Sequence, residues 1–177
     1  LRPPITYGVH PESDCVGRLV STFPTLQFRW DFNAKSLIDA PLLESKIYGD
    51  YNFAHVLVAA AIGRYLSVPY DKISEALTTW EPRNNRSQWL AHRGHGVVLD
   101  AYNANPTSMS AAVNAFANTS NDNKVAILGD MLELGEEAHI EHLAMIALLR
   151  KLNLQAYLVG PEFVKCSSSF KSFFSFV

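Results

Sequence analysis

The stretch Lys124–Gly160, KVAILGDMLELGEEAHIEHLAMIALLRKLNLQAYLVG, decides the fold. It begins and ends with short apolar runs, KVAILG at 124–129 and AYLVG at 156–160, and a helical pattern lies between them from about residue 136 to 152. A strand, a helix and a second apolar strand in this order are typical of a parallel sheet with right-handed crossovers. The sequence therefore predicts an α/β, Rossmann-like fold for this half of the chain.

The segment before this unit extends the same pattern toward the N-terminus. GVVLD at 96–100 is apolar and short, and we expect it to be an earlier strand of the parallel sheet. A helix is expected from Pro106 to about Asn118, because Asn105 is a favourable N-cap and proline is tolerated in the first helical turn. Arg93-Gly94-His95-Gly96 is typical of a hairpin turn that leads into the 96–100 strand.

The first eighty residues have a different pattern. Between residues 5 and 38 short extended pieces alternate with turns, and LQFRWDF at 26–32 alternates apolar and polar residues, which predicts antiparallel hairpins with one wet face. Two helices are expected next, at 51–66 and 71–80. Their expected inward positions are Val56, Ala59, Ala60, Gly63, Leu66, Ile73, Ala76, Leu77 and Trp80.

The polar segment EPRNN at 81–85 is the expected domain boundary. We predict one domain at 1–81, the end of a larger α/β domain, and a Rossmann-like domain at 82–177 that lacks its last strands. The opening LRPPITYG has no initiating Met and no secretory signal pattern, so the chain is expected to begin within a longer protein.

Composition excludes several classes of protein. The chain has 177 residues, of which 48% are hydrophobic and 18% charged, which is typical of globular domains and not of disordered chains. The 15 Lys and Arg against 17 Asp and Glu give a net charge of −2. This excludes an overall positive charge that would attract nucleic acid. The longest apolar run, 53–66, is too short to cross a bilayer.

Two distant cysteines, Cys15 and Cys166, predict free thiols in a reducing compartment, the cytoplasm.

Candidate binding residues follow the predicted strands. In open parallel sheets ligands bind beyond the carboxyl ends of the strands. The expected strand 96–100 ends in Asp100, Asp130 directly follows 124–129, and both strands lead into polar loops. We expect these two carboxylates to converge on one crevice. An equally compatible interpretation of the first loop is a capped helix with turn-forming asparagines.

Other features carry weaker predictions. His139 and His142 are three residues apart but lack the HExxH pattern, so we interpret them as surface or interface residues and not as zinc ligands. Arg83 and Arg86 are either solvated charges or cations that clamp a phosphate when domains close. Neither GxxxxGK[ST] nor GxGxxG occurs, so the chain has no phosphate cradle of its own.

Two longer motifs resemble a known family. The motifs are similar to the C-terminal domain of the Mur ligases, and their residues resemble those of the member that adds a dipeptide. They are LDAYNANPTSMSAAV at 99–113 and VAILGDMLELGEEAHIEH at 125–142. IYGDYNFAHVLVAAAIGRYLSV at 47–68 resembles the end of the family's central ATP-binding domain, and NNRSQ at 84–88 its interdomain arginine segment. The resemblance extends from about Gly49 to Gly160.

The resemblance implies an activity and its cofactors. A ligase of this type uses ATP and Mg²⁺ to form an acyl phosphate on a UDP-MurNAc-tripeptide, which the amine of D-Ala-D-Ala then attacks in peptidoglycan precursor synthesis. It implies a cytoplasmic monomer that neither binds nucleic acid nor inserts into a membrane. The P-loop and the Mg²⁺ ligands have no counterpart here, so we expect an internal fragment that is inactive alone, with no catalytic or metal residue of its own.

The resemblance also implies roles for individual residues. Asn52, Arg86 and Asp100 match ATP-binding positions at the adenine, the phosphates and the ribose. The loops that face the dipeptide and the reaction centre contribute Tyr102, Asn103, Asn105, Asp130 and Glu133. The family's HNxxN motif reads Tyr51-Asn52-Phe53-Ala54-His55 here, so the adenine contact at position 55 differs.

Two alternatives stay open at this point. The chain could belong to another Mur-type or folylpolyglutamate-type amide ligase, although YNANPTSM at 102–109 favours the dipeptide-adding type. It could also be a Rossmann-like module that binds a nucleotide without catalysis, which the missing P-loop permits.

Overall fold

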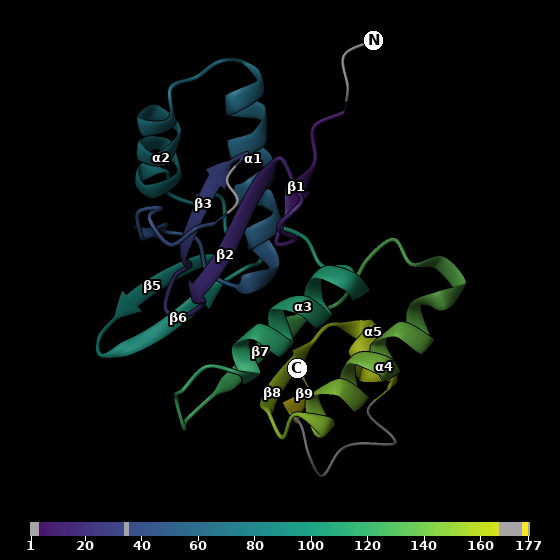
Figure 1. The fold of residues 1–177 in the computed structure, drawn as a ribbon. Helices are drawn as coiled ribbons and strands as arrows, with labels where there is room; N and C mark the ends of the chain where they lie inside the picture. Colours follow the sequence, from purple (N-terminus) through teal and green to yellow (C-terminus); the bar gives the residue numbers. More distant parts are fainter. Residues whose placement is uncertain (1–3, 34–35, 167–174, 177) are drawn as a thin grey trace. The chain divides into compact units, whose positions relative to one another are not determined.

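The computed structural model describes residues 4–33, 36–166 and 175–176 (Figure 1). The chain divides into two compact units, Leu1–Asp100 and Ala101–Val177, which are described separately. Both contain helices and strands, so the α/β class is confirmed. Within the described ranges no helix is long and apolar enough to span a membrane. The predicted domain boundary at 81/82 stays a prediction.

The first unit is built on a four-stranded sheet in the order β1-β2-β3-β4. The strands are β1 (Tyr7–Gly8), β2 (Cys15–Ser21), β3 (Gln27–Phe32) and β4 (Leu43–Glu44). β2, β3 and β4 pair antiparallel, as expected, but β1 pairs parallel to β2, so the prediction of hairpins throughout was wrong at β1. The Asp14 carboxylate accepts hydrogen bonds from the amide (2.7 Å) and hydroxyl (2.8 Å) of Thr6, which holds the returning chain in the parallel register.

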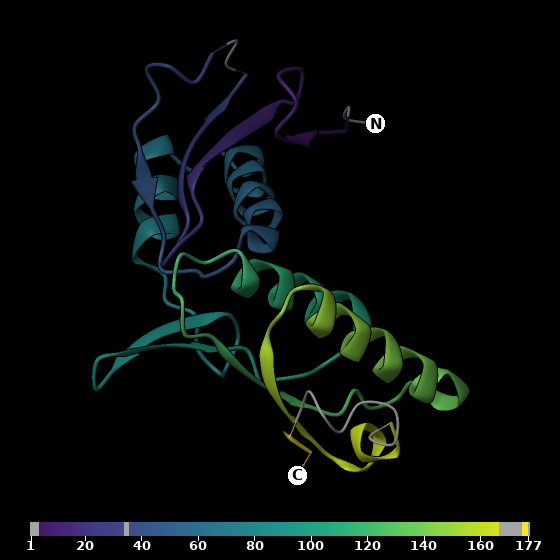
Figure 2. The same ribbon diagram turned by 90° about the horizontal axis from the view of Figure 1, so that it is seen from below.

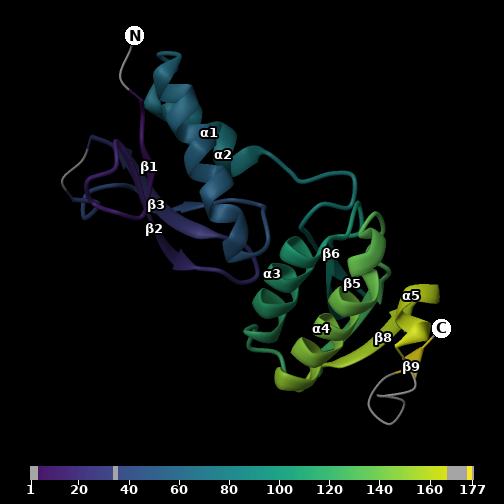
Figure 3. The same ribbon diagram turned by 90° about the vertical axis from the view of Figure 1, so that its right-hand side faces the viewer.

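Two helices cover this sheet, and Figure 3 shows both on the same face. They are α1 (Phe53–Tyr65), which follows the 3₁₀ turn η1 (Asp50–Asn52), and α2 (Tyr70–Thr79). The alternation in 26–32 is confirmed, because Leu26, Phe28 and Trp30 are all fully buried. A Cβ on Gly63 would lie 2.9 Å from Ile73, so this glycine allows α1 and α2 to approach closely.

The predicted inward faces of the helices were only partly right. α1 buries the i, i+3, i+4, i+7, i+8 stripe Phe53, Val56, Leu57, Ala60 and Ala61. Val56 and Ala60 were expected on this face, whereas Phe53, Leu57 and Ala61 were not. Of the expected residues, Ala59, Leu66, Ala76 and Trp80 are exposed instead. Leu66 and Trp80 follow the last helical residues, so the helix faces do not include them.

A separate hairpin completes the first unit and corrects one prediction. β5 (Gln88–His92) and β6 (His95–Leu99) pair antiparallel in a two-stranded sheet, so 96–100 is not a strand of the parallel sheet. The predicted turn is confirmed, with φ of 48° at Arg93 and 79° at Gly94, and this two-residue connection is what forces antiparallel pairing. A Cβ on Gly96 would lie 2.0 Å from the ring of Trp89, so the indole packs directly on the β6 backbone.

The second unit has the predicted parallel sheet, in the order β7-β8-β9. Its elements are α3 (Pro106–Ala117), β7 (Val125–Gly129), the 3₁₀ turn η2 (Gly135–Glu137), α4 (Ala138–Lys151), β8 (Gln155–Val159), α5 (Pro161–Lys165) and β9 (Ser175–Phe176). β7 pairs parallel to β8, with Val125 opposite Gln155. β9 was not predicted, and residues 167–174 and 177 of the tail lie outside the described residues.

The helices of the second unit cover one face of its sheet. Figure 2 shows α3 and α4 side by side. Ala126, Ala156 and Leu158 are buried beneath the helices, whereas Ile127 and Tyr157, which alternate with them, are exposed. The carboxyl end of β7 leads directly into the loop that contains Asp130, so the sheet fixes where this loop begins.

Candidate functional site

Asp100 follows β6 and is held by the residues around it. Its Oδ1 accepts a hydrogen bond from the Ser87 amide (3.0 Å), and its Oδ2 accepts from the hydroxyls of Tyr51 (3.1 Å) and Ser87 (3.3 Å). These three contacts use three of the roughly four lone pairs of a carboxylate. Because Asp100 is exposed, Oδ1 retains a position that can accept a hydrogen bond from a ligand hydroxyl.

Tyr51 is fixed from two sides. A Cβ on Gly49 would lie 2.2 Å from its ring, and Gly49 has a φ of 87°, so only glycine suits that position. Burial raises the pKa of the Tyr51 hydroxyl well above its ordinary value, which keeps it a neutral donor toward Asp100. Tyr51, which stands where the family's motif has a histidine, therefore has a fixed position beside Asp100.

The other two predicted ATP-binding residues lie in the same unit. The Asn52 Nδ2 donates to the carbonyl oxygen of Tyr48 (2.8 Å), and its Oδ1 lies 3.1 Å from the His55 Nδ1. Arg86 is exposed on a turn in which Asn85 and Ser87 have φ of 59° and 44°. Their roles toward ATP stay predictions.

The first polar loop of the second unit uses its asparagines locally. The Asn105 side chain accepts a hydrogen bond from the amide of Ser108 (2.9 Å) and so caps α3, as predicted. Asn103 accepts from the amide of Ala104 (2.9 Å). Tyr102 is 61% exposed. These contacts match the capped-helix interpretation, and the substrate-binding roles of the three residues stay predictions.

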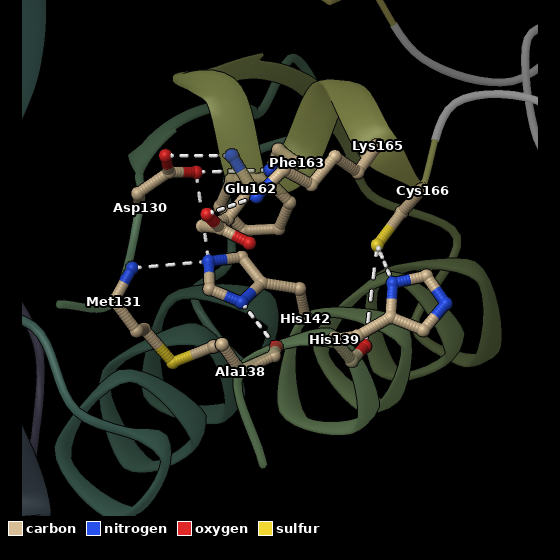
Figure 4. Close-up of polar contacts among 9 residues, drawn as sticks. All are labelled: Asp130, Met131, Ala138, His139, His142, Glu162, Phe163, Lys165 and Cys166. Carbon is tan, nitrogen blue, oxygen red and sulfur yellow. Dashed lines mark hydrogen bonds and ion pairs between the residues drawn. The ribbon is translucent and has the colours of Figure 1, made fainter. Parts of the chain in front are cut away.

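The second polar loop is anchored at its first residue, as Figure 4 shows. The Asp130 carboxylate accepts hydrogen bonds from the amides of Glu162 and Phe163, both at 2.9 Å, which lie in the first turn of α5. This is the usual arrangement for an acidic side chain at a helix N-terminus. Glu133 is exposed, with a φ of 67°. The expected convergence of Asp100 and Asp130 involves two units and stays a prediction.

The interpretation of His142 as a surface or interface residue was wrong. Its side chain is fully buried, its Nε2 accepts a hydrogen bond from the Met131 amide (3.1 Å), and its Nδ1 lies 2.6 Å from the Ala138 carbonyl oxygen. His139 is exposed, and its Nδ1 lies 3.5 Å from the Cys166 Sγ. In the part of the chain that the structure describes, no cluster of three or more His, Cys, Asp or Glu side chains could hold a metal ion.

The sequence did not predict the contacts that three residues make. Tyr51 and Ser87 hold Asp100, and His142 holds the loop after β7. Tyr51 could have been suspected, because it replaces the histidine expected from the resemblance. Ser87 and His142 had no local signal, because their partners lie 13 and 11 residues away in the sequence.

Comparison with known proteins identifies the second half of the chain. Residues 85–171 match the family described as "Mur ligase, glutamate ligase domain". The UDP-N-acetylmuramoyl-tripeptide–D-alanyl-D-alanine ligase of Mycobacterium bovis is 33% identical over 120 residues, which cover 64% of this chain and 24% of that protein. The ligase of the same name from Treponema pallidum is 34% identical over 118 residues, which cover 66% and 26%.

Solved structures have the same fold. MurF from Acinetobacter baumannii matches 97% of this chain and 37% of its own, with a TM-score of 0.79 and 23% identity. MurF ligase from Thermotoga maritima in complex with ADP matches 97% and 44%, with a TM-score of 0.73 and 16% identity. The chain spans about a quarter of the length of the curated relatives it matches. Residues 85–171 of this chain therefore match the glutamate ligase domain of the Mur ligase family.

Proposed function

We propose that this chain is part of an ATP-dependent ligase that joins D-Ala-D-Ala to a UDP-MurNAc-tripeptide in peptidoglycan precursor synthesis. The observation that carries the proposal is the 33–34% identity, over about two thirds of the chain, to ligases whose names state this reaction. Because the chain spans about a quarter of those proteins, we assign the activity to the longer ligase and not to these residues alone.

The proposed chemistry solves a specific problem, which is that a carboxylate is a poor electrophile. A carboxylate oxygen of the tripeptide attacks the γ-phosphorus of ATP, and ADP leaves. The amine of D-Ala-D-Ala then attacks the acyl carbon, loses a proton and expels phosphate, so that an amide bond forms. Cationic side chains stabilise the charge on the transferring phosphoryl group.

On the nucleotide side we assign the ribose to Asp100, the phosphates to Arg86 and the adenine to Asn52. The fit is best at Asp100, where Tyr51 and Ser87 hold the carboxylate and leave an acceptor position on Oδ1. A neutral sugar hydroxyl is a suitable donor for that position. For the dipeptide side we assign the two polar loops of the second unit, with Tyr102, Asn103, Asn105, Asp130 and Glu133.

Mg²⁺ is included in the proposal as the usual partner of ATP. The described residues of this chain do not fit a site for it, because they contain no suitable cluster of ligands. No step above is therefore routed through the metal. The proposal places a monomeric enzyme in the cytoplasm, where ATP is available and where the two free thiols stay reduced.

The test replaces Asp100 by alanine in the full-length ligase that carries this sequence. Because hydrogen bonds to charged groups contribute about 1.5–3 kcal/mol, we expect the KM for ATP to rise roughly tenfold to hundredfold, with the KM for D-Ala-D-Ala unchanged. Phosphate release measured at varied ATP gives the result. Asp122→Ala, an exposed aspartate in a loop, is the matched control.

Two outcomes would contradict the proposal. Unchanged ATP kinetics in Asp100→Ala would remove the ribose assignment. ATP binding by the wild-type ligase without any D-Ala-D-Ala-dependent phosphate release would instead favour a nucleotide-binding module without catalysis.

A further inference from the structure

His142 is a fully buried histidine whose two ring nitrogens both have partners (Figure 4). Nδ1 lies 2.6 Å from the carbonyl oxygen of Ala138, one turn earlier in α4. Nε2 lies 3.1 Å from the amide nitrogen of Met131, in the loop that follows β7. The ring of Phe163 packs edge-on against the imidazole, with 4.6 Å between the ring centroids.

These partners define which nitrogen carries the proton. A carbonyl oxygen can only accept a hydrogen bond, so Nδ1 must donate to Ala138. A backbone amide can only donate, so Nε2 must present its lone pair to Met131. The hydrogen bonds to Ala138 and Met131 therefore fit an imidazole that carries its proton on Nδ1 and accepts at Nε2.

A second anchor holds the same loop at the neighbouring residue. Asp130 caps α5 through the amides of Glu162 and Phe163, and its Oδ1 lies 3.5 Å from the His142 Nε2. The side chain of Asp130 is only 7% exposed. Asp130 and Met131 are thus tied to α5 and α4, and the Met131 side chain is buried in the core.

Beyond Asp130 and Met131, the tip of the loop at Leu132 and Glu133 is exposed to solvent. Leu132 is 68% exposed and Glu133 is exposed, whereas the chain returns to regular structure at η2. Glu133 has a φ of 67°, a conformation that is strained for residues other than glycine. The backbone can keep this conformation because Asp130 and Met131 anchor it before Glu133 and η2 follows it. A carboxylate presented in this way complements a cationic amine.

We propose that His142 is a positioning residue: its ring donates through Nδ1 and accepts through Nε2, and it holds Asp130–Leu134 so that Glu133 faces the amine end of D-Ala-D-Ala. This inference rests on the proposed function for the identity of the ligand. Within this loop of the proposed dipeptide side, it gives Asp130 a supporting role and Glu133 the contact with the amine.

The first experiment tests the anchor in the ¹⁵N-labelled 177-residue chain. We expect the imidazole ¹⁵N shifts of His142 to report a proton on Nδ1, and a ¹⁵N–¹⁵N coupling to connect Nε2 with the Met131 amide across the hydrogen bond. Absence of this coupling, or a proton on Nε2, would overturn the inference, whatever the enzyme does.

The second experiment uses three variants. His142→Phe keeps a ring but removes the acceptor, so hydrogen exchange of the Met131 amide should accelerate by at least about tenfold. His142→Gln can place an amide oxygen near the Nε2 position and should restore most of the protection. His139→Gln changes the exposed histidine of the same helix and should leave the Met131 amide unaffected. Equal exchange in the Phe and Gln variants would contradict an acceptor role.

The third experiment measures kinetics in the full-length ligase. We expect His142→Phe to raise the KM for D-Ala-D-Ala by at least about tenfold, with the KM for ATP unchanged and partial rescue by His142→Gln. An unchanged dipeptide KM in a folded Phe variant would overturn the positioning role. A wild-type ligase without activity toward D-Ala-D-Ala, in which the coupling is nonetheless present, would refute the proposed function and the dipeptide assignment while confirming the anchor.

Discussion

Asp130 shows how one side chain can serve both a helix and a loop. Its carboxylate satisfies two amides of α5, which would otherwise lack partners at the helix start. The contact depends on Gly160, the residue before α5, which has a φ of 122°. A Cβ there would lie 2.4 Å from the Asp130 Cγ. The strand-to-helix turn after β8 therefore requires glycine for both backbone and space.

The prediction at this scale concerns Gly160→Ala. We expect it to lower the free energy of unfolding of the second unit by about 1–3 kcal/mol, because alanine is strained at this φ and displaces the Asp130 carboxylate. Gly129→Ala is the matched control, since a Cβ at Gly129 meets nothing within 4 Å. Urea unfolding followed by backbone amide signals gives the measurement, and equal stability of the two variants would argue against the strained contact.

Among the elements, α3 begins at a well-specified point. Asn105 has extended backbone angles, accepts the Ser108 amide and precedes Pro106. The same residue is a proposed dipeptide contact, so its capping and binding contributions need to be separated. A substitution that preserves the cap but changes the donor capacity of the side chain achieves this.

We expect Asn105→Ala to cost about 1 kcal/mol of stability through loss of the cap, and Asn105→Asp to cost little, because aspartate caps equally well. In the full-length ligase both variants should raise the KM for D-Ala-D-Ala if the amide group binds the dipeptide. Thermal unfolding and dipeptide kinetics are measured on the same samples. A stability loss in Asn105→Asp as large as in Asn105→Ala would exclude the capping account.

At the scale of the whole molecule, buried thiol and phenol groups make the stability of the first unit depend on alkaline pH. In the first unit burial raises the pKa of Cys15 to about 11 and that of Tyr48 to about 12, from ordinary values of 9.0 and 10.0. Nearby Asp31 and Asp50 add smaller contributions in the same direction. The folded unit therefore keeps protons that the unfolded chain releases.

Stability of the first unit should consequently fall as pH rises from about 9 to 11, with Cys15 alone accounting for up to about 3 kcal/mol. Trp30, Trp80 and Trp89 are the three tryptophans of the chain and all lie in this unit, so denaturant curves read by tryptophan fluorescence report on it. Cys15→Ala should flatten the pH dependence, whereas Cys166→Ala in the second unit should not. Identical pH profiles for wild type and Cys15→Ala would refute the assignment.

Local sequence patterns determined much of this protein. The alternation in 26–32, the Arg93-Gly94 turn, the Asn105-Pro106 helix start and the strand–helix–strand order of 124–160 all appear in the structure as expected. Each depends on residues close together in sequence, where backbone preference and periodicity act directly. Apart from Asn52, which lies in η1, the predicted site residues lie in loops.

Only the tertiary structure decided which strands pair and which polar side chains are buried. The 96–100 segment pairs with β5 and not with β7, and His142 is buried against Met131 and not at the surface. Asp130 caps a helix 32 residues away, and Tyr51 reaches Asp100 across 49 residues. A polar group can be buried only where a distant partner satisfies its hydrogen bonds, and no local pattern records that partner.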